Sequence, residues 1–287
     1  MRSPRTLVCI LSQTREHEVV WHNFKVNVLD FLNADLALSI AVPSDYDYDN
    51  PYWQHAKYKW TSPEYADWKE AFYCAQGILD ADNSWEMLLS IPDNWLAPVN
   101  GHRGAGGILI YHRWLLLHKM REEGVLDKYD RFIVTRSDYN YLSPHPPMEY
   151  LNPGILWVPD GEHYGSITDR HVVLSRGNVE QYLNILENMM FRPAELYAKL
   201  YNWCNLEKAV HQNVGLQLGF DCWCAFPFIM YSLRSEGVAT RWAEGHWKPE
   251  LLHYVKYPGE YDAAMKNAEI FKTREDWSRW YHANFAH

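Results

Sequence analysis

The residues best placed to do chemistry are Arg136, Asp138 and Asn140, which directly follow the apolar run 132–135. A short β-branched apolar run is typical of a fully buried strand. In an open α/β sheet, ligands bind beyond the carboxyl ends of such strands. A carboxylate there, with an amide oxygen two residues later, could hold a divalent cation against a diphosphate. Asp138 and Asn140 are therefore predicted ligands of Mn²⁺ or Mg²⁺, in an enzyme that uses nucleotide sugars.

A glycine cluster at residues 100–107, Asn-Gly-His-Arg-Gly-Ala-Gly-Gly, precedes a helical pattern. Glycines let a backbone approach a phosphate closely, and helix N-termini favour anions. The cluster is neither a dinucleotide-binding fingerprint nor a Walker loop. It is either a flexible helix entry or an anion site, and Arg103 within it favours the anion. Arg103 and Arg136, with Lys248 or Lys256 from the tail, are the predicted cations for a diphosphate.

Three acidic residues precede a later apolar run at 171–174, where an acceptor could bind; they are Asp160, Glu162 and Asp169. Each is a candidate general base, since a carboxylate can take a proton from an attacking hydroxyl. Asp169 also has a structural interpretation, in which it pairs with Arg170. Glu207 and His211 lie one helical turn apart, a spacing that suits either metal chelation or a pair on a solvated face.

The spacing of apolar residues predicts the elements that position these side chains. Residues 6–11 and 35–42 read as buried strands and residues 16–32 as a helix, which together make a βαβ unit and a parallel sheet. Residues 43–61 read as a surface loop. A helix is expected from Pro63 to Leu79, with Ser62 as its N-cap. Further helices are expected at 178–190, 193–201, 206–218 and 273–283.

Size and charge limit the class of protein. The 287 residues, 47% of them hydrophobic, fit a single domain with about 1–145 on the nucleotide side and about 146–287 on the acceptor side. The net charge of −9 argues against a nucleic-acid partner, which requires a basic face. Aromatic residues make up 15% of the chain, which suits either a sugar-stacking cleft or a core of large side chains.

The location is expected to be the cytoplasm, of a cell or of a virus-infected host. The five cysteines are odd in number and scattered, as in a chain with reduced thiols. No signal peptide opens the sequence, and no apolar stretch is long enough for a transmembrane segment. The sequence does not indicate an oligomeric state.

Three ordered segments resemble the GT-A type glycosyltransferases found in polysaccharide clusters and large algal viruses. They are the strand ending in Ser12-Gln13-Thr14-Arg15, the run Tyr129 to Asp138 (Tyr-Asp-Arg-Phe-Ile-Val-Thr-Arg-Ser-Asp), and the run Ile167 to Ser175. Together they span about 60% of the chain. The resemblance implies a GT-A-like (Rossmann-like) α/β fold: a mostly parallel sheet flanked by helices in a single domain with a mixed C-terminal tail.

The resemblance also implies roles for particular residues. Ser12, Gln13, Thr14 and Arg15 would line the nucleotide pocket. Asp138 would replace the family's metal-binding Asp-x-Asp, although Ser137 and Asn140 depart from that pattern. His246 would supply a metal ligand from late in the chain, and Asp169 would be the general base of an inverting reaction.

The function expected from these features is transfer of a hexosyl or pentosyl group from a UDP-sugar to a glycan hydroxyl, with metal assistance. Two other functions fit the same pattern. One is a different α/β enzyme acting on phosphorylated small molecules, such as a nucleotidyltransferase or phosphatase. The other is a non-catalytic carbohydrate-binding protein. A serine hydrolase is disfavoured because no Gly-x-Ser-x-Gly motif occurs.

Overall fold

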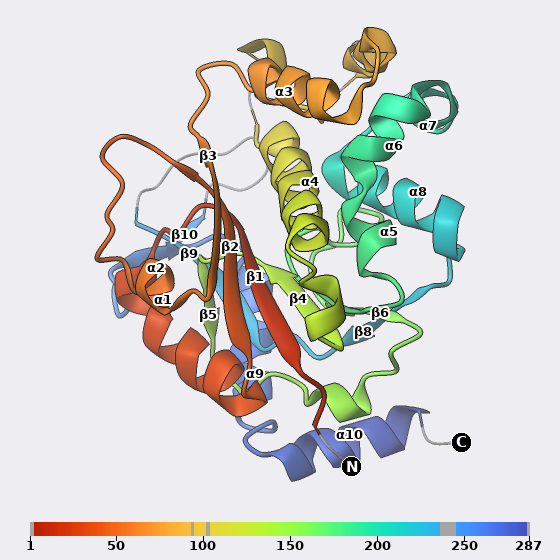
Figure 1. Cartoon of the computed structure of the whole chain (residues 1–287). Helices are drawn as coiled ribbons and strands as arrows, with labels where there is room; N and C mark the ends of the chain where they lie inside the picture. The colour runs from red at the N-terminus through yellow and green to blue at the C-terminus, as the bar shows by residue number, and fades with distance from the viewer. Residues whose placement is uncertain (1–2, 93–94, 102–103, 236–244, 286–287) are drawn as a thin grey trace.

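The computed structural model describes residues 3–92, 95–101, 104–235 and 245–285, and a seven-stranded sheet forms its centre (Figure 1). The strands follow the order β3-β2-β1-β4-β7-β6-β8. All neighbours pair in parallel except at β7, which is antiparallel to both β4 and β6. The expected mostly parallel α/β sheet is confirmed. Its strands are β1 (Thr6–Ser12), β2 (Asp35–Val42), β3 (Tyr58–Pro63), β4 (Arg131–Thr135), β6 (Leu156–Pro159), β7 (Val172–Ser175) and β8 (Trp223–Phe226).

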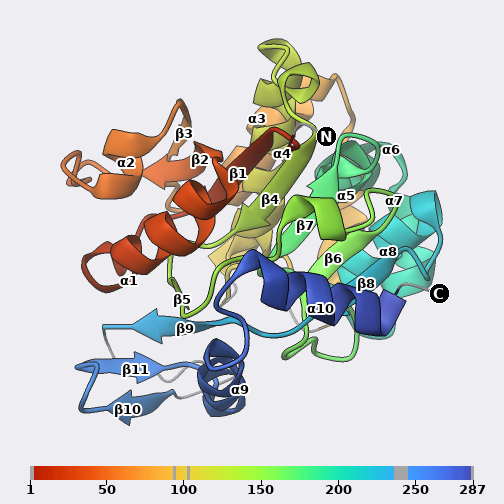
Figure 2. The ribbon, with the colours of Figure 1, turned by 90° about the horizontal axis from the view of Figure 1, so that it is seen from below.

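Helices cover both faces of this sheet (Figures 1 and 2). One face packs against α3 (Lys69–Leu79), α4 (Gly106–Glu122), α5 (Val179–Leu183), α6 (Ile185–Phe191), α7 (Pro193–Leu200) and α8 (Leu206–Leu218). The other packs against α1 (His17–Phe24), α2 (Pro51–His55), α9 (Pro258–Ala268) and α10 (Arg274–Phe285). Short helical turns lie at η1 (Lys25–Asp30), η2 (Asn83–Ser90), η3 (Val99–Gly101), η4 (Leu126–Lys128) and η5 (Met148–Tyr150). No helix in the described ranges is long and apolar enough to cross a bilayer.

The apolar run of β1 explains this three-layer arrangement. Successive side chains of a strand point to opposite faces of the sheet. Leu7 and Cys9 accordingly pack in the core on the α4 side, while Val8 and Ile10 pack in the core on the α1 side. All four are fully buried, as expected for a strand covered on both faces.

A second, antiparallel sheet adjoins the carboxyl end of β4 (Figure 2). Its order is β10 (His246–Lys248), β11 (His253–Val255), β9 (Met230–Arg234) and β5 (Tyr139–Tyr141). The Leu233 N–H donates to the carbonyl of Asp138 at 2.9 Å. Because β5 follows β4 closely along the chain, this bond holds the end of β9 beside the end of β4. The C-terminal part of the chain thus contributes to the edge of the main sheet where ligands are expected.

The predicted surface loop at residues 43–61 is wrong in its second half. Asn50 accepts a hydrogen bond from the Tyr52 N–H at 3.0 Å and caps α2, and β3 follows. Trp60 is buried between exposed neighbours, a period of two that marks an edge strand. Ser62 lies in β3 and is therefore not a helix N-cap, and the helix expected from Pro63 begins only at Lys69.

Candidate active site

The turn after β1 brings the ends of β1 and β4 together. Ser12 and Glu16 have φ angles of 71° and 60°, in the left-handed region that non-glycine residues rarely adopt. Between them the backbone N–H of Arg15 donates to the Ser137 hydroxyl at 3.0 Å. The guanidinium group of Arg15 is thereby directed at the residues that follow β4.

Asp138 is held by two arginines. Its side chain is 1% exposed. Arg15 Nη2 donates to Oδ2 at 2.7 Å, while Arg136 donates from Nε to Oδ1 at 3.1 Å and from Nη2 to Oδ2 at 2.9 Å. Burial by itself would raise the pKa of Asp138, but the Arg136 and Arg15 charges outweigh burial and hold that pKa far below its usual range. Asp138 is therefore an anion that organises cations.

The predicted metal ligands Asp138 and Asn140 are engaged by other side chains in this arrangement. Both Asp138 oxygens already accept from guanidinium groups. The amide of Asn140 is also engaged: its Oδ1 accepts from Asn23 at 2.7 Å and its Nδ2 donates to the Tyr231 hydroxyl at 2.9 Å. His246 is exposed on β10, and β11 and β9 separate it from β5. Within the described ranges, no group of three or more His, Cys, Asp or Glu side chains is arranged to hold a metal.

Two further cations lie near Asp138, and both are at the ends of strands of the second sheet. Arg234 ends β9, and its Nε is buried without a hydrogen-bond partner in the described part of the chain. Burial, followed by the Arg15 and Arg136 charges, lowers the pKa of Arg234. Lys256 follows β11; burial, then the charges of Arg136 and Arg234, lower its pKa to about 7. We call Arg15, Arg136, Arg234 and Lys256 the cation cluster.

Three members of the cation cluster line two pockets. The first, the β1 pocket, has a volume of about 670 Å³ and includes Arg15 in its wall. The second, the α4 pocket, includes Arg136 and Lys256 in its wall. Asp138 lines neither pocket, because it lies behind the arginines that do.

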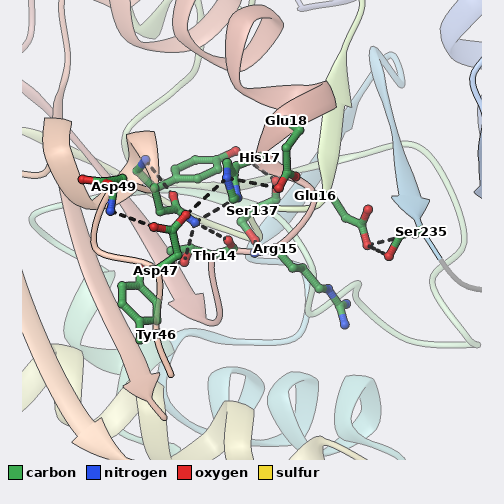
Figure 3. A network of polar contacts seen from close by, with 12 residues as sticks. Thr14, Arg15, Glu16, His17, Glu18, Tyr46, Asp47, Asp49, Ser137 and Ser235 are labelled. Carbon is green, nitrogen blue, oxygen red and sulfur yellow. Dashed lines mark hydrogen bonds and ion pairs between the residues drawn. The ribbon is translucent and has the colours of Figure 1, made fainter. Parts of the chain in front are cut away.

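A polar network forms the wall of the β1 pocket (Figure 3). The hydroxyls of Thr14 and Tyr46 are 2.7 Å apart, and Asn50 donates to the Thr14 carbonyl at 2.7 Å. Asn50 also lies 3.0 Å from Nδ1 of His17, whose other ring nitrogen faces Asp47 at 3.9 Å. Figure 3 shows the Arg15 side chain extending away from this network.

The carboxylates of the β1 pocket determine what it can bind. Glu16, Glu18, Asp47 and Glu64 all contribute to its wall. Carboxylates accept hydrogen bonds and repel phosphate. The β1 pocket therefore suits a group rich in O–H and N–H donors, such as a nucleoside, while the neighbouring cation cluster suits phosphates.

The glycine cluster begins α4 and also lines the α4 pocket through residues 104–106. A β-carbon at Gly106 would lie 1.8 Å from the Trp95 carbonyl oxygen, and one at Gly107 would lie 2.4 Å from that of Leu96. Close backbone packing therefore requires glycine at both positions. Both also lie at the N-terminus of α4. Arg103, the predicted cation of this cluster, lies outside the described residues.

Two carboxylates share the α4 pocket. Asp169, a predicted general base, is there, with Oδ2 3.9 Å from the buried Arg113 guanidinium. Its main-chain carbonyl also accepts from Arg113 at 2.6 Å. Glu207, in the first turn of α8, is the second carboxylate. Burial, and then the charge of Asp169, raise the pKa of Glu207 to about 8.

Three other predicted site residues lie elsewhere. Asp160 and Glu162 line a third cavity, between the 160–162 loop and the start of α9. Tyr257 contributes to both this cavity and the α4 pocket. Lys248 lies on β10 with Nζ 4.5 Å from the centre of the Tyr261 ring, and it lines neither pocket. Of the two tail lysines considered, Lys256 is the one that reaches the site.

Sequence reasoning missed the place of Arg234 near Asp138 and that of Glu207 in the α4 pocket. The expected alternatives for Glu207 both involved His211, but Nδ1 of His211 lies 2.8 Å from the Ser166 hydroxyl instead. Among the described residues no ion pair joins Glu207 to His211. The sequence signal for Glu207 was its position at the start of a predicted helix, just after Asn205. In the structure Asn205 caps α8, and the first turn of this helix lines the α4 pocket.

No protein-family model matches the chain, and no curated protein sequence matches it. Two solved structures are similar to it. One is a glycosyltransferase involved in the glycosylation of the major capsid of PBCV-1, with 9% identity and a TM-score of 0.38 over 78% of this chain and 82% of that chain. The other is mouse xyloside xylosyltransferase 1 in its apo form, with 8% identity and a TM-score of 0.38 over 78% of this chain and 85% of that chain. Similarity this low assigns neither a residue nor an activity to this chain, so its function has to be argued from the site.

Proposed function

We propose that this protein is a glycosyltransferase that moves a sugar from a nucleoside diphosphate sugar to a hydroxyl of a glycan acceptor. One observation carries the proposal: the cation cluster adjoins two pockets. Arg15 lines the β1 pocket, which suits a nucleoside, and Arg136 and Lys256 line the α4 pocket, which holds two carboxylates. A nucleotide sugar has the same order of parts, with a nucleoside, a diphosphate and a sugar. A UDP-sugar is the first candidate donor.

The cation cluster matches the charge of a diphosphate. Three guanidinium groups, of Arg15, Arg136 and Arg234, lie around the carboxylate of Asp138, and Asp169 is a second negative charge near Arg136. The unpaired positive charge is costly in a half-buried site unless an anion joins it. The two negative charges of a sugar diphosphate would offset that cost and would raise the pKa of Lys256.

The reaction breaks the bond between the anomeric carbon and the diphosphate oxygen. The bonding electrons leave with the diphosphate, whose charge grows in the transition state. Arg136 and Lys256 line the pocket where this bond would lie, so they would stabilise the leaving group electrostatically. In this proposal the cation cluster supplies the positive charge that the sequence analysis assigned to a metal.

The acceptor hydroxyl enters from the opposite side of the anomeric carbon in an inverting transfer and must lose its proton. The α4 pocket offers carboxylates for this step, and Asp169 is the one that the sequence predicted. Tyr164 and Tyr257 line the same pocket and add aromatic and hydroxyl surface that a sugar can contact.

Thermal unfolding with a panel of UDP- and GDP-sugars tests the proposal. At least one donor should raise the melting temperature by several degrees, and the Arg136→Met variant should lose that gain. Arg176→Met is the matched control, because Arg176 pairs with Asp127 and Asp130 at the opposite end of β4. Release of pyrophosphate or phosphate in place of nucleoside diphosphate would identify a nucleotidyltransferase or phosphatase, and glycan binding without any nucleotide effect would identify a binding protein.

A further inference from the structure

We infer that Glu207 takes the proton of the acceptor hydroxyl, and that Asp169, beside the buried Arg113, holds the substrate. The inference rests on the proposed function and names the residue that performs its proton-transfer step. Glu207 and Asp169 line the same pocket from different elements, α8 and the segment before β7.

The surroundings of the two carboxylates differ. Asp169 has the guanidinium group of Arg113 at 3.9 Å, and Arg113 is itself fully buried and bonded to the Asp169 carbonyl. Glu207 has no ion pair to any residue in the described ranges; its carboxylate is shifted instead by burial and by the negative charge of Asp169. Two acids in one pocket with such different surroundings are typical of a divided catalytic role.

Other charged and titratable groups also face Glu207. Arg170 precedes β7, Lys256 follows β11, Tyr164 lies in the loop before Arg170, and Tyr182 is on α5. Arg170 and Lys256 favour the ionised form of Glu207, but they do not outweigh burial and Asp169. Arg170 is already paired with Glu260, through Nη1 to Oε2 at 3.0 Å. A pKa near the working pH is the property that a general base requires.

In the proposed step, proton transfer to Glu207 accompanies formation of the new glycosidic bond. The O–H bond of the acceptor breaks and its proton moves to the Glu207 carboxylate. The acceptor oxygen forms a bond with the anomeric carbon as the bond from that carbon to the diphosphate breaks. The electron pair leaves on the diphosphate next to the cation cluster, and Glu207 later returns its proton to water.

The test compares Glu207→Gln with Asp169→Asn, using UDP-sugars and release of UDP as the measure of transfer. Glu207→Gln should keep the melting-temperature gain with the donor while its kcat falls by about 100-fold or more. The rising limb of the kcat profile near pH 8 should disappear, and Glu207→Asp should restore part of the rate with a shifted profile. Glu195→Gln, on the exposed face of α7, is the control and should match the parent protein.

A second measurement does not depend on the donor. The pKa of Glu207 is raised in the folded state, from 4.5 to about 8, so its contribution to stability is lost as pH rises through about 8. The parent protein should therefore lose melting temperature between about pH 5 and pH 8 more steeply than Glu207→Gln. Parallel curves would overturn the inference, as would a Glu207→Gln enzyme with normal kcat. A parent protein that binds no nucleotide sugar would instead overturn the proposed function.

Discussion

Asp138 and Glu207 are both enclosed carboxylates at the carboxyl edge of the sheet, yet their pKa values shift in opposite directions. Asp138 lies among arginines, which hold its pKa far below the usual range. Glu207 lies opposite Asp169, and its pKa rises to about 8. Burial raises the pKa of both groups, so the sign of the nearest charge accounts for the difference. The comparison teaches that the role of an acid in this site is set by its neighbours.

This difference divides the site into two regions with separate tasks. The region around Asp138 is a permanently charged scaffold that is ready to receive an anion. The region around Glu207 can gain and lose a proton near neutral pH. A group-transfer enzyme needs both, because it must stabilise a leaving group and also deprotonate an acceptor.

The largest expected effect is on the stability of the scaffold. Asp138→Ala removes the buried carboxylate that Arg15 and Arg136 bind and should lower the free energy of unfolding by about 3–5 kcal/mol. Urea unfolding followed by circular dichroism measures this change. In the same assay at pH 9, Glu207→Gln should raise the free energy of unfolding. The two substitutions should therefore change stability in opposite directions. A destabilisation by Asp138→Ala of under about 1 kcal/mol would remove the basis of the comparison.

The next effect is on anion binding. Arg136→Met should weaken binding of the stabilising UDP-sugar by about 10- to 100-fold, since a hydrogen bond to a charged group contributes about 1.5–3 kcal/mol. Isothermal titration calorimetry measures the affinity. The control Arg176→Met should bind like the parent protein, and an equal loss in both variants would point to a nonspecific effect of charge.

A smaller effect concerns pH. Lys256 has a pKa of about 7 in the free protein, and a bound diphosphate would raise it. Binding should therefore take up a proton, and affinity for a UDP-sugar should increase as pH falls from 8 to 6, by up to about tenfold. Lys256→Met should bind more weakly at pH 6 and lose most of this dependence. Affinity that rises with pH in the parent protein would contradict the assignment.

The smallest expected effect tests the region around Asp138 for metal. If the cation cluster neutralises the diphosphate by itself, adding Mn²⁺ or EDTA should change the melting-temperature gain from a UDP-sugar by less than about 1 °C, because no coordinate bonds are made or lost. A melting-temperature gain that appears only with Mn²⁺ would show that Asp138 gives up an arginine contact to bind a metal. The region around Asp138 would then be a metal site and not a cationic scaffold.

Much of the central fold could be predicted from local patterns. The apolar runs predicted β1, β2 and β4 with bounds close to those observed. The spacing of four in residues 206–218 predicted α8 with its observed bounds. The edge strand β3 was missed because its polar, aromatic residues carry a weak period-two signal, and an edge strand takes much of its identity from the neighbour it pairs with.

The sequence by itself determined that Arg15, Arg136 and Asp138 directly follow buried strands, and the structure pairs those two strands in parallel. Only the tertiary structure decided that Arg234 and Lys256 would complete the cluster, that Asp138 would face arginines, and that Glu207 would face Asp169. The physical reason is the range of the forces involved. Backbone periodicity is a local property that a chain displays along its length. The electrostatic environment of a side chain depends on charges within a few ångströms, and folding brings those charges from distant parts of the chain.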